Sequence, residues 1–428
     1  MAFDLNLPLG LVLTFSVTFL VSDAAVQQCS YWCHIYTLFT AENMCCDQSH
    51  SSSSINGNVQ LTREKQIPEV QHHGDLNAAV SEDSKVNQSP KIILFWTHFF
   101  GRWDYEFGLG HKPFLDNQCP VSNCLTTSDR SLEKEASAVV FHLRNVNKDT
   151  VFPSNRLPNQ SYVFFLQENP FNQWNHLAQF NGVFNLTMTY RLDSDAPVPY
   201  GGFLNTPSQR LDHNLRIKLV KGKKKLIAWF VSNCGPTHSK REDYVKQLQR
   251  YIEVDVYGKC GPLRCPDKDV PLLTARMNEE CYNMLERDYK FYISFENNLC
   301  KDYITEKSYN ILGRYIVPIV YGGGNYSTSM PPQSVINIRD FKSPKHLADF
   351  LVSLDGDDER YMEYFNWKND LEAIGQFKAR GRGFCKLCEI LNDRKREAKV
   401  YGDIHSWWDK DGSCDFKTPR DLKNSYEP

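Results

Sequence analysis

Apolar residues gather along this chain in short uninterrupted runs, separated by stretches with helical spacing. Runs that are apolar throughout are typical of parallel strands covered on both faces. Three such runs are 91–97, 137–143 and 162–168. A second series of strand-like runs comprises 225–233, 253–258, 291–297 and 315–324.

Helical patterns lie between the strand-like runs. The segment 241–252 places Tyr244, Val245 and Leu248 on one helical face. Because strands and helices alternate in both halves of the chain, we predict an α/β fold of two Rossmann-like domains facing a cleft. The basic segment 216–225, between the halves, is interpreted as a solvated connector.

One predicted strand of the second half ends in polar residues, and a helix begins shortly after it. Glu296 and Asn297 end the strand, Thr305 suits a helix N-cap, and Glu306 and Lys307 fall in the first turn. Free backbone N–H groups and the helix dipole favour an anion at such a position. Lys307 suits a diphosphate and Glu306 suits paired sugar hydroxyls, so we predict a nucleotide site here.

The bulk composition adds two limits. The chain has 428 residues, of which 23% are charged and 41% hydrophobic, with a formal net charge of −2. Its length suggests two or three domains. The absence of a basic excess argues against nucleic acid as the main partner.

Cysteines and glycosylation motifs together indicate the secretory pathway. There are 14 cysteines, many for a cytosolic enzyme. Asparagines followed by x-Ser or x-Thr mark candidate N-glycosylation sites. These are Asn87, Asn159, Asn185 and Asn325.

The N-terminus begins with an apolar segment, residues 5–21, which is at the short limit for a membrane span. No Lys or Arg precedes it, so the pattern leaves both a signal-anchor and a cleaved signal peptide open. Residues 22–89 are polar and have little periodicity, which predicts a stem. Cys29, Cys33, Cys45 and Cys46 in this stem have no evident partners.

The stretch FYISFENNLCKDYITEKSYNIL, residues 291–312, together with the following VPIVYGG, closely resembles the donor-binding motif of the α1,3-fucosyltransferases, glycosyltransferase family 10. The segments 226–261 and 184–201 are similar to two further patches of that family. SYNIL after TEK departs from the family, in which many members have Leu-Trp or Phe. The resemblance implies a GT-B fold, a GDP-fucose donor and inversion at the fucose carbon.

The resemblance also implies roles for individual residues. Glu168, in QENP, matches the general base, and Arg241 matches an Arg that contacts the donor diphosphate. The other donor-binding positions that it implies are Asn297, Tyr303, Glu306 and Lys307. The acceptor would be O3 of a GlcNAc in a glycoprotein glycan. The enzyme would be a single-pass type II protein of the Golgi membrane with a lumenal catalytic domain.

These inferences divide the chain into five parts. The predicted parts are residues 1–21 (signal-anchor or signal peptide), 22–89 (stem), 90–220 (acceptor-binding domain), 221–378 (GDP-fucose-binding domain) and 379–428 (a tail that crosses back).

Four cysteines at short spacings are candidates for stapling the fold. Cys119 and Cys124, with Cys385 and Cys388, fit either a zinc site or disulfides, and an oxidising lumen favours disulfides. The resemblance implies that the C-terminal pair crosses back to the N-terminal pair, with the connectivity open. A further small loop between Cys260 and Cys265 is possible from their spacing.

Asp193 and Asp195 form an Asp-x-Asp motif in the acceptor half, which is interpreted as structural, so no metal or other cofactor is expected in the chemistry. The acceptor is either the innermost GlcNAc of an N-glycan or an outer lactosamine-type unit, chosen by loops 98–135 and 168–182. A lectin-like binder on an inactive scaffold and a transferase for another sugar nucleotide are the alternatives.

Overall fold

A computed structural model describes most of the chain after the predicted stem. The described residues are 89–147, 149–154, 156–172, 177–205, 212–265, 279–412 and 414. The apolar segment 5–21, the four stem cysteines and Asn87 lie outside these ranges. Within them, no helix is long and apolar enough to cross a membrane.

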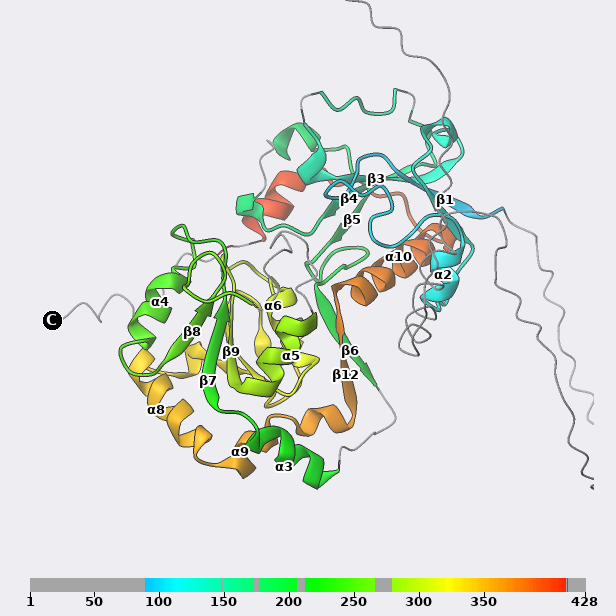
Figure 1. The fold of residues 1–428 in the computed structure, drawn as a ribbon. Coiled ribbons are helices and arrows are strands. Elements are labelled where there is room, and N and C mark those ends of the chain that lie inside the picture. Colours follow the sequence, from blue (N-terminus) through cyan, green and yellow to red (C-terminus); the bar gives the residue numbers. More distant parts are fainter. Residues whose placement is uncertain are drawn as a thin grey trace, which may run out of the picture. The chain divides into compact units, whose positions relative to one another are not determined.

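The first half contains a five-stranded parallel sheet (Figure 1). Its spatial order is β2 (Cys124–Thr127), β1 (Lys91–Phe95), β3 (Ala136–His142), β4 (Ser161–Leu166) and β5 (Leu186–Thr189). All six residues of β4 are buried, as expected for a strand covered on both faces. The three apolar runs predicted as strands in this half are confirmed as β1, β3 and β4.

The second half contains another five-stranded parallel sheet. Its spatial order is β11 (Ile336–Asn337), β10 (Val317–Tyr321), β9 (Tyr289–Phe295), β7 (Lys225–Phe230) and β8 (Val254–Tyr257). Every residue of the central strand β9 is buried. Two parallel α/β sheets in one chain confirm the predicted GT-B fold class.

Helices connect and cover these strands (Figure 1). They are α2 (Lys112–Asp116), α3 (His213–Lys221), α4 (Arg241–Leu248), α5 (Glu279–Asp288), α6 (Glu306–Leu312), α7 (Tyr326–Ser329), α8 (Pro344–Asp355), α9 (Asp358–Glu363) and α10 (Gln376–Asn392). Short 3₁₀ turns lie at Arg130–Leu132, Leu143–Asn145, Pro170–Asn172, Leu177–Phe180, Ile338–Asp340 and Asn366–Asn369, and a π-helical turn at Ser406–Lys410.

The basic segment 216–225 is more ordered than a solvated connector. It contains the end of α3 and the first residue of β7. Lys223 is buried, and its Nζ donates a hydrogen bond of 2.9 Å to the carbonyl of Tyr289. Burial lowers the pKa of Lys223 to about 8. The interpretation holds for Lys218, Lys221, Lys224 and Lys225, which are exposed. It is wrong for Lys223, because a long Lys stem can cover apolar surface while its ammonium bonds main-chain carbonyls.

The chain crosses between the halves at two strands that lie side by side. β6 (Gly201–Asn205) leaves the first half, and β12 (Leu371–Gly375) returns to it, in an antiparallel pair. After β12, helix α10 lies along the first sheet (Figure 1). Phe384 and Leu387 of α10 belong to the core under that sheet.

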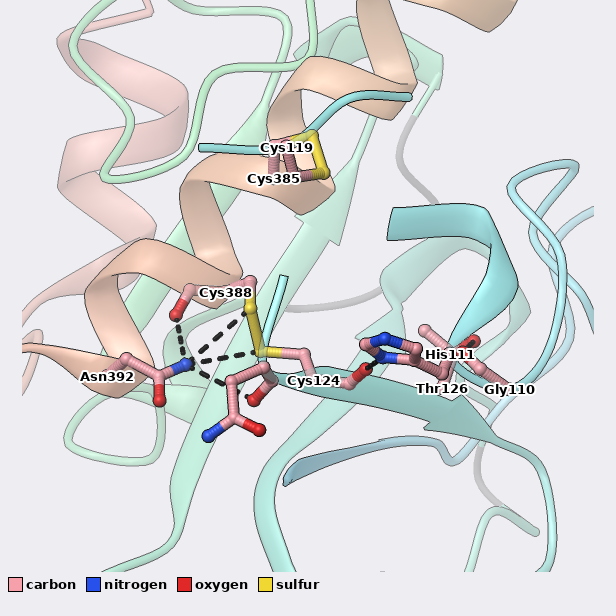
Figure 2. Close-up of a disulfide and its surroundings, with 9 residues drawn as sticks. Gly110, His111, Cys119, Cys124, Thr126, Cys385, Cys388 and Asn392 are labelled. Atoms are coloured by element: carbon pink, nitrogen blue, oxygen red, sulfur yellow. Dashed lines mark hydrogen bonds between the residues drawn. A yellow bond between two sulfur atoms is a disulfide. The ribbon is translucent and has the colours of Figure 1, made fainter. Parts of the chain in front are cut away.

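Two disulfides attach α10 to the first half (Figure 2). They join Cys119 to Cys385 and Cys124 to Cys388. All four sulfurs are therefore bonded in pairs, not arranged around zinc. Beside them, Asn392 Nδ2 donates 2.9 Å to the carbonyl of Cys388 (Figure 2).

The suggested small loop between Cys260 and Cys265 is wrong. Cys260 pairs with Cys234, and Cys265 pairs with Cys281 of α5. The backbone N–H of Cys260 donates 3.3 Å to the carbonyl of Val231, just past the end of β7. This bond turns Cys260 toward Cys234, so the sheet and not the local spacing decides the pairing.

The three described candidate glycosylation sites differ in their surroundings. Asn159 and Asn325 are exposed. Asn185 is half-buried, and its Nδ2 donates 2.8 Å to the carbonyl of Lys399 while its Oδ1 accepts 2.8 Å from the N–H of Tyr162. A glycan on the Asn185 nitrogen would displace the Lys399 contact.

Candidate active site

The first candidate catalytic group stands just past the end of β4. Glu168 is half-buried, and its Oε2 accepts a hydrogen bond of 2.9 Å from Asn172 Nδ2. The turn Pro170–Asn172 follows immediately. Glu168 therefore stands at the carboxyl edge of the first sheet, where open α/β sheets bind ligands.

The second sheet also ends in a carboxylate, at Glu296 after β9. Its side chain is fully buried and faces inward. Oε1 accepts 2.8 Å from the N–H of Thr305, and both oxygens accept from Thr305 Oγ1. Burial raises the pKa of Glu296, against the attraction of Lys307. Glu296 therefore fixes the start of α6 and is not open to a ligand.

The predicted N-cap at Thr305 is confirmed, and it brings Lys307 beside Glu296. Thr305 Oγ1 accepts from the N–H of Lys307. Lys307 Nζ donates to Thr305 Oγ1 at 2.8 Å, Glu296 Oε2 at 3.1 Å and Glu306 Oε1 at 3.3 Å. Burial alone would lower the pKa of Lys307, but the two carboxylates raise it. The ammonium is thus held charged and fixed, with 29% of its side chain exposed.

The loop between β9 and α6 contains buried amide oxygens without partners. Within the part of the chain that the structure describes, the side-chain Oδ1 atoms of Asn297 and Asn298 have no hydrogen bond. Buried acceptors of this kind are rare in proteins and are commonly satisfied by a ligand or an ordered water. The Asn297 carbonyl is bonded by the N–H of Ser239 at 3.1 Å, which fixes the loop.

Arg241, the first residue of α4, is buried at the edge of the second sheet. Its NH1 donates 2.8 Å to the carbonyl of Phe295, and its Nε donates 3.0 Å to Glu242 Oε1. The positive charge of Arg241 acts to lower the pKa of Lys307, so the two cations lie within electrostatic range of each other. Both therefore belong to the same end of β9.

A set of tyrosines connects the two strand ends. Tyr303 is buried, with its ring 5.0 Å from Tyr190 and 6.0 Å from Tyr200. Burial raises the pKa of Tyr303, and nearby carboxylates raise it further; these are Glu168, Glu296 and Glu306. Carboxylates of both halves thus raise the pKa of Tyr303, which places this tyrosine within electrostatic range of both strand ends.

A ring contact between the two halves lies near the same strand ends. The ring of Phe171, in the turn after Glu168, lies 4.6 Å from that of His238. His238 belongs to the loop between β7 and α4 that leads to Arg241. Five of the six residues predicted for the site therefore lie at the carboxyl end of β9: Arg241, Asn297, Tyr303, Glu306 and Lys307. Glu168 approaches this end from β4, through Tyr303 and the Phe171–His238 contact.

Comparison with known proteins identifies the family. "Fucosyltransferase, N-terminal" matches residues 88–201, and "Glycosyltransferase family 10 (fucosyltransferase) C-term" matches residues 220–407. The chain belongs to glycosyltransferase family 10. It is a fucosyltransferase.

Three similar proteins illustrate the range of this family. Alpha-(1,3)-fucosyltransferase C of Drosophila melanogaster is 37% identical, over 75% of this chain and 78% of its own. Glycoprotein 3-alpha-L-fucosyltransferase A of the same organism is 35% identical, over 80% of this chain and 65% of its own. The 4-galactosyl-N-acetylglucosaminide 3-alpha-L-fucosyltransferase FUT6 of Pan troglodytes is 38% identical, over 71% and 80%.

A crystal structure of an alpha1,3-fucosyltransferase with GDP-fucose is 16% identical to this chain. The matched region spans 74% of this chain and 96% of the chain in that crystal structure, with a TM-score of 0.43.

Two contributors to the site of this fucosyltransferase were missed by sequence reasoning. Glu296 was given no role of its own, yet it accepts from Thr305 and Lys307, and the signal for this was the Thr305 N-cap nine residues later. Tyr200 was not singled out, although its hydroxyl donates 2.6 Å to the carbonyl of Gln167 next to Glu168. It lies at the end of the segment 184–201 that carried the family resemblance.

The Asp-x-Asp motif of the fucosyltransferase is occupied by internal partners. Asp193 bonds Arg191 and Lys301, at 2.6 Å and 3.0 Å. Asp195 bonds Lys399 at 2.6 Å and the N–H of Thr187 at 2.9 Å. These ion pairs agree with a structural role for both acids. Among the described residues, no group of three or more His, Cys, Asp or Glu side chains is arranged to hold a metal ion.

Proposed function

We propose that this enzyme transfers L-fucose from GDP-fucose to O3 of a GlcNAc residue in a glycoprotein glycan, with inversion at the fucose anomeric carbon. The observation that carries the proposal is that Glu168, after β4, and Glu306, which is ion-paired with Lys307 after β9, both lie within electrostatic range of the buried Tyr303. A half-buried carboxylate of the first half and the fixed Lys307–Glu306 pair of the second half therefore approach the same tyrosine. The names of the relatives, which include 3-alpha-L-fucosyltransferase, support the linkage and the sugar.

Around the proposed GDP-fucose site, the protein supplies positive charges and hydrogen-bond-accepting oxygens of the types that a nucleoside diphosphate sugar needs. Lys307 would act as a point charge on the diphosphate and Arg241 as a second cation, which together stabilise the leaving GDP. The exposed part of Glu306 would accept sugar hydroxyls. The unpartnered Oδ1 of Asn297 would accept a further hydroxyl or N–H. In this proposal the charge on the leaving group is met by the protein itself, without a metal.

On the acceptor side, Glu168 would act as the general base. The attacking O3 hydroxyl must lose its proton as the new bond forms, and a carboxylate within hydrogen-bond reach can take it. Asn172 holds one oxygen of Glu168 at 2.9 Å and leaves the other to the acceptor. Attack on the face opposite the departing GDP inverts the anomeric carbon.

Exposed aromatic side chains suit a sugar acceptor. Phe100 is 51% exposed and Trp103 is 44% exposed, in the loop after β1, and Phe171 is 42% exposed near Glu168. Phe100 has a φ of 45°, which is unusual for a bulky residue and costs energy. These rings would stack on the sugars next to the reacting GlcNAc. The relatives include enzymes named for glycoproteins and for galactosyl-GlcNAc, so both acceptor classes enter the test.

The cellular part of the proposal rests on the disulfides and the N-terminal segment. Five disulfides among the described cysteines fit an oxidising compartment. We place the enzyme in the Golgi membrane, single-pass type II, with residues 1–21 at the membrane and the described residues in the lumen.

Mass spectrometry of the products tests the proposed reaction. The enzyme is incubated with GDP-fucose, GDP-mannose or a UDP-sugar, and with a core N-glycan or a lactosamine. One added fucose on O3 of GlcNAc, from GDP-fucose alone, is the expected product. No transfer to either acceptor, with the glycan still bound, would instead favour a lectin-like binder. Transfer from another donor would favour a different sugar nucleotide.

A further inference from the structure

We propose that the C-terminal tail is a positioning element for the reaction, which holds the donor loop against the loop that carries the general base. The tail is defined as residues 399–412 with Cys414, and the donor loop as residues 297–304. This inference rests on the proposed function, because it assigns the tail to the alignment of GDP-fucose with Glu168.

The tail is bonded covalently and through its backbone to the donor loop. A disulfide joins Cys414 to Cys300, which is fully buried. The N–H of Lys301 donates 3.1 Å to the carbonyl of Gly412. Tyr303, a predicted donor contact, follows two residues later. The loop between β9 and α6 is therefore fixed from outside as well as by Glu296.

The same part of the tail touches the loop of the general base. A Cβ added to Gly412 would lie 3.4 Å from Cγ of Pro170 and would overlap the carbonyl oxygen of Trp408. Pro170 is two residues after Glu168. Gly412 thus lies between the loop that carries Glu168 and the donor loop. Any side chain at this position would force the Trp408 carbonyl to shift.

Aromatic packing extends this junction to Tyr303. The ring of Trp408, fully buried, lies 5.5 Å from Tyr190. Tyr190 in turn lies 5.0 Å from Tyr303. Arg191 is also buried, stacks 4.2 Å over the ring of Trp407 and donates to its carbonyl.

Ion pairs and hydrogen bonds then join the donor loop to the turn after β5. Lys301 Nζ lies 3.0 Å from Asp193 Oδ2. The N–H of Leu192 donates 3.2 Å to Asp302 Oδ2. The tail, this turn and the donor loop therefore meet at one three-way junction, which would set the distance between the donor and Glu168. Displacements of about 1 Å far from the reacting atoms can cost about 100-fold in rate.

The test removes the disulfide between Cys300 and Cys414. It then measures how GDP-fucose divides between transfer to the acceptor and hydrolysis by water. Cys300→Ala/Cys414→Ala is compared with Cys265→Ala/Cys281→Ala, which removes a disulfide outside the junction. For each folded enzyme, kcat and KM for transfer and the rate of GDP-fucose hydrolysis by water are measured. We expect the junction variant to lose about 10- to 100-fold in kcat for transfer. Hydrolysis per transfer should rise, because the donor still binds but meets the acceptor badly.

The control variant should change its unfolding temperature but not this partition. Equal partition in the junction variant and the wild type would overturn the proposal. If the junction variant does not fold, Gly412→Ala decides, since it keeps the disulfide and displaces the Trp408 carbonyl against which Gly412 packs. It should show the same rise in hydrolysis per transfer, and an unchanged ratio would overturn the proposal. A wild type that transfers no fucose would instead refute the proposed function.

Discussion

Two glutamates occupy equivalent places in the two sheets, yet the protein uses them differently. Glu168 follows β4 and Glu296 follows β9, each near the carboxyl end of a buried parallel strand. Glu168 is half-buried and accepts one hydrogen bond from Asn172. Glu296 is fully buried and accepts from Thr305 and Lys307.

This difference teaches that position at a strand end does not decide whether a carboxylate is available for chemistry. The decisive property is how many internal donors its oxygens already have. Glu296 uses both oxygens to order the start of α6, and in doing so it fixes Lys307 for a ligand. Glu168 accepts from Asn172 at Oε2, and in the proposed reaction its other oxygen would take the proton of the acceptor hydroxyl. The following predictions test that contrast.

Removing the basic oxygen of Glu168 should have the largest effect. In Glu168→Gln the transfer rate should fall by about 10³-fold, since the amide cannot take the proton of the acceptor hydroxyl. GDP affinity, measured by calorimetry, should stay at the wild-type value because the donor contacts are untouched. Transfer at a near wild-type rate would remove Glu168 from its assigned role.

Glu296 should behave as a stability residue. Glu296→Ala leaves the Thr305 N–H and the Lys307 ammonium without their buried acceptor, and should lower the free energy of unfolding by about 3 kcal/mol in urea titrations. Glu296→Gln keeps one oxygen for Thr305 and should cost roughly half as much. If both variants unfold like the wild type, the ordering role is wrong.

Replacing Lys307 should weaken the binding of GDP. Lys307→Ala should weaken GDP binding by about 10- to 100-fold, because one fixed charge on the diphosphate is lost. Lys307→Arg should recover part of the affinity, and Lys345→Ala, on the exposed face of α8, serves as the matched control. Unchanged GDP affinity in Lys307→Ala, measured by calorimetry, would contradict the diphosphate contact.

The two regions should also respond differently to acid. His142 ends β3 in the first half, and burial lowers its pKa to about 4. The hydrogen bond that its Nδ1 donates to Asn145 Oδ1 acts against this shift, and the charges of Arg144 and His98 add to it. The unfolded His142 takes up a proton near pH 6.5, so its stabilising contribution is present above that pH and lost as the pH falls toward 4.

For Glu296 the sign is opposite, because burial raises its pKa and protonation relieves the cost of the buried charge. Between pH 7 and pH 5.5, His142 should account for a loss of about 1 kcal/mol in the free energy of unfolding. His142→Asn should reduce the acid sensitivity measured by thermal unfolding over this range. Identical pH profiles of variant and wild type would show that His142 does not contribute.

The sequence predicted the continuous strands and the start of α6 well. β9 and α6 are local: an apolar run, a Thr cap and a Lys in the first turn lie within 17 consecutive residues, from Phe291 to Lys307. The fate of Glu296 was not predictable in the same way. Its inward orientation depends on three hydrogen bonds to Thr305, and composition gives no sign of side-chain direction.

Long-range pairing explains the remaining errors. β6 and β12 have little apolar character and exist because they pair with each other across 166 residues, from Asn205 to Leu371. Cys260 was expected to pair locally, but the end of β7 presents Cys234 to it. Asn185 stays a candidate glycosylation site, and the motif gave no sign of its bond to Lys399, which depends on the returning tail.

The placement of α10 has a consequence for how the chain is made. The first sheet is completed at Thr189, but the helix that covers it begins at Gln376. At typical rates of synthesis, the ribosome adds the intervening segment in roughly 10 to 40 seconds. During that interval the emerging half exposes the apolar surface that α10 later covers, so we expect this surface to need shielding, as by a chaperone, until α10 leaves the ribosome.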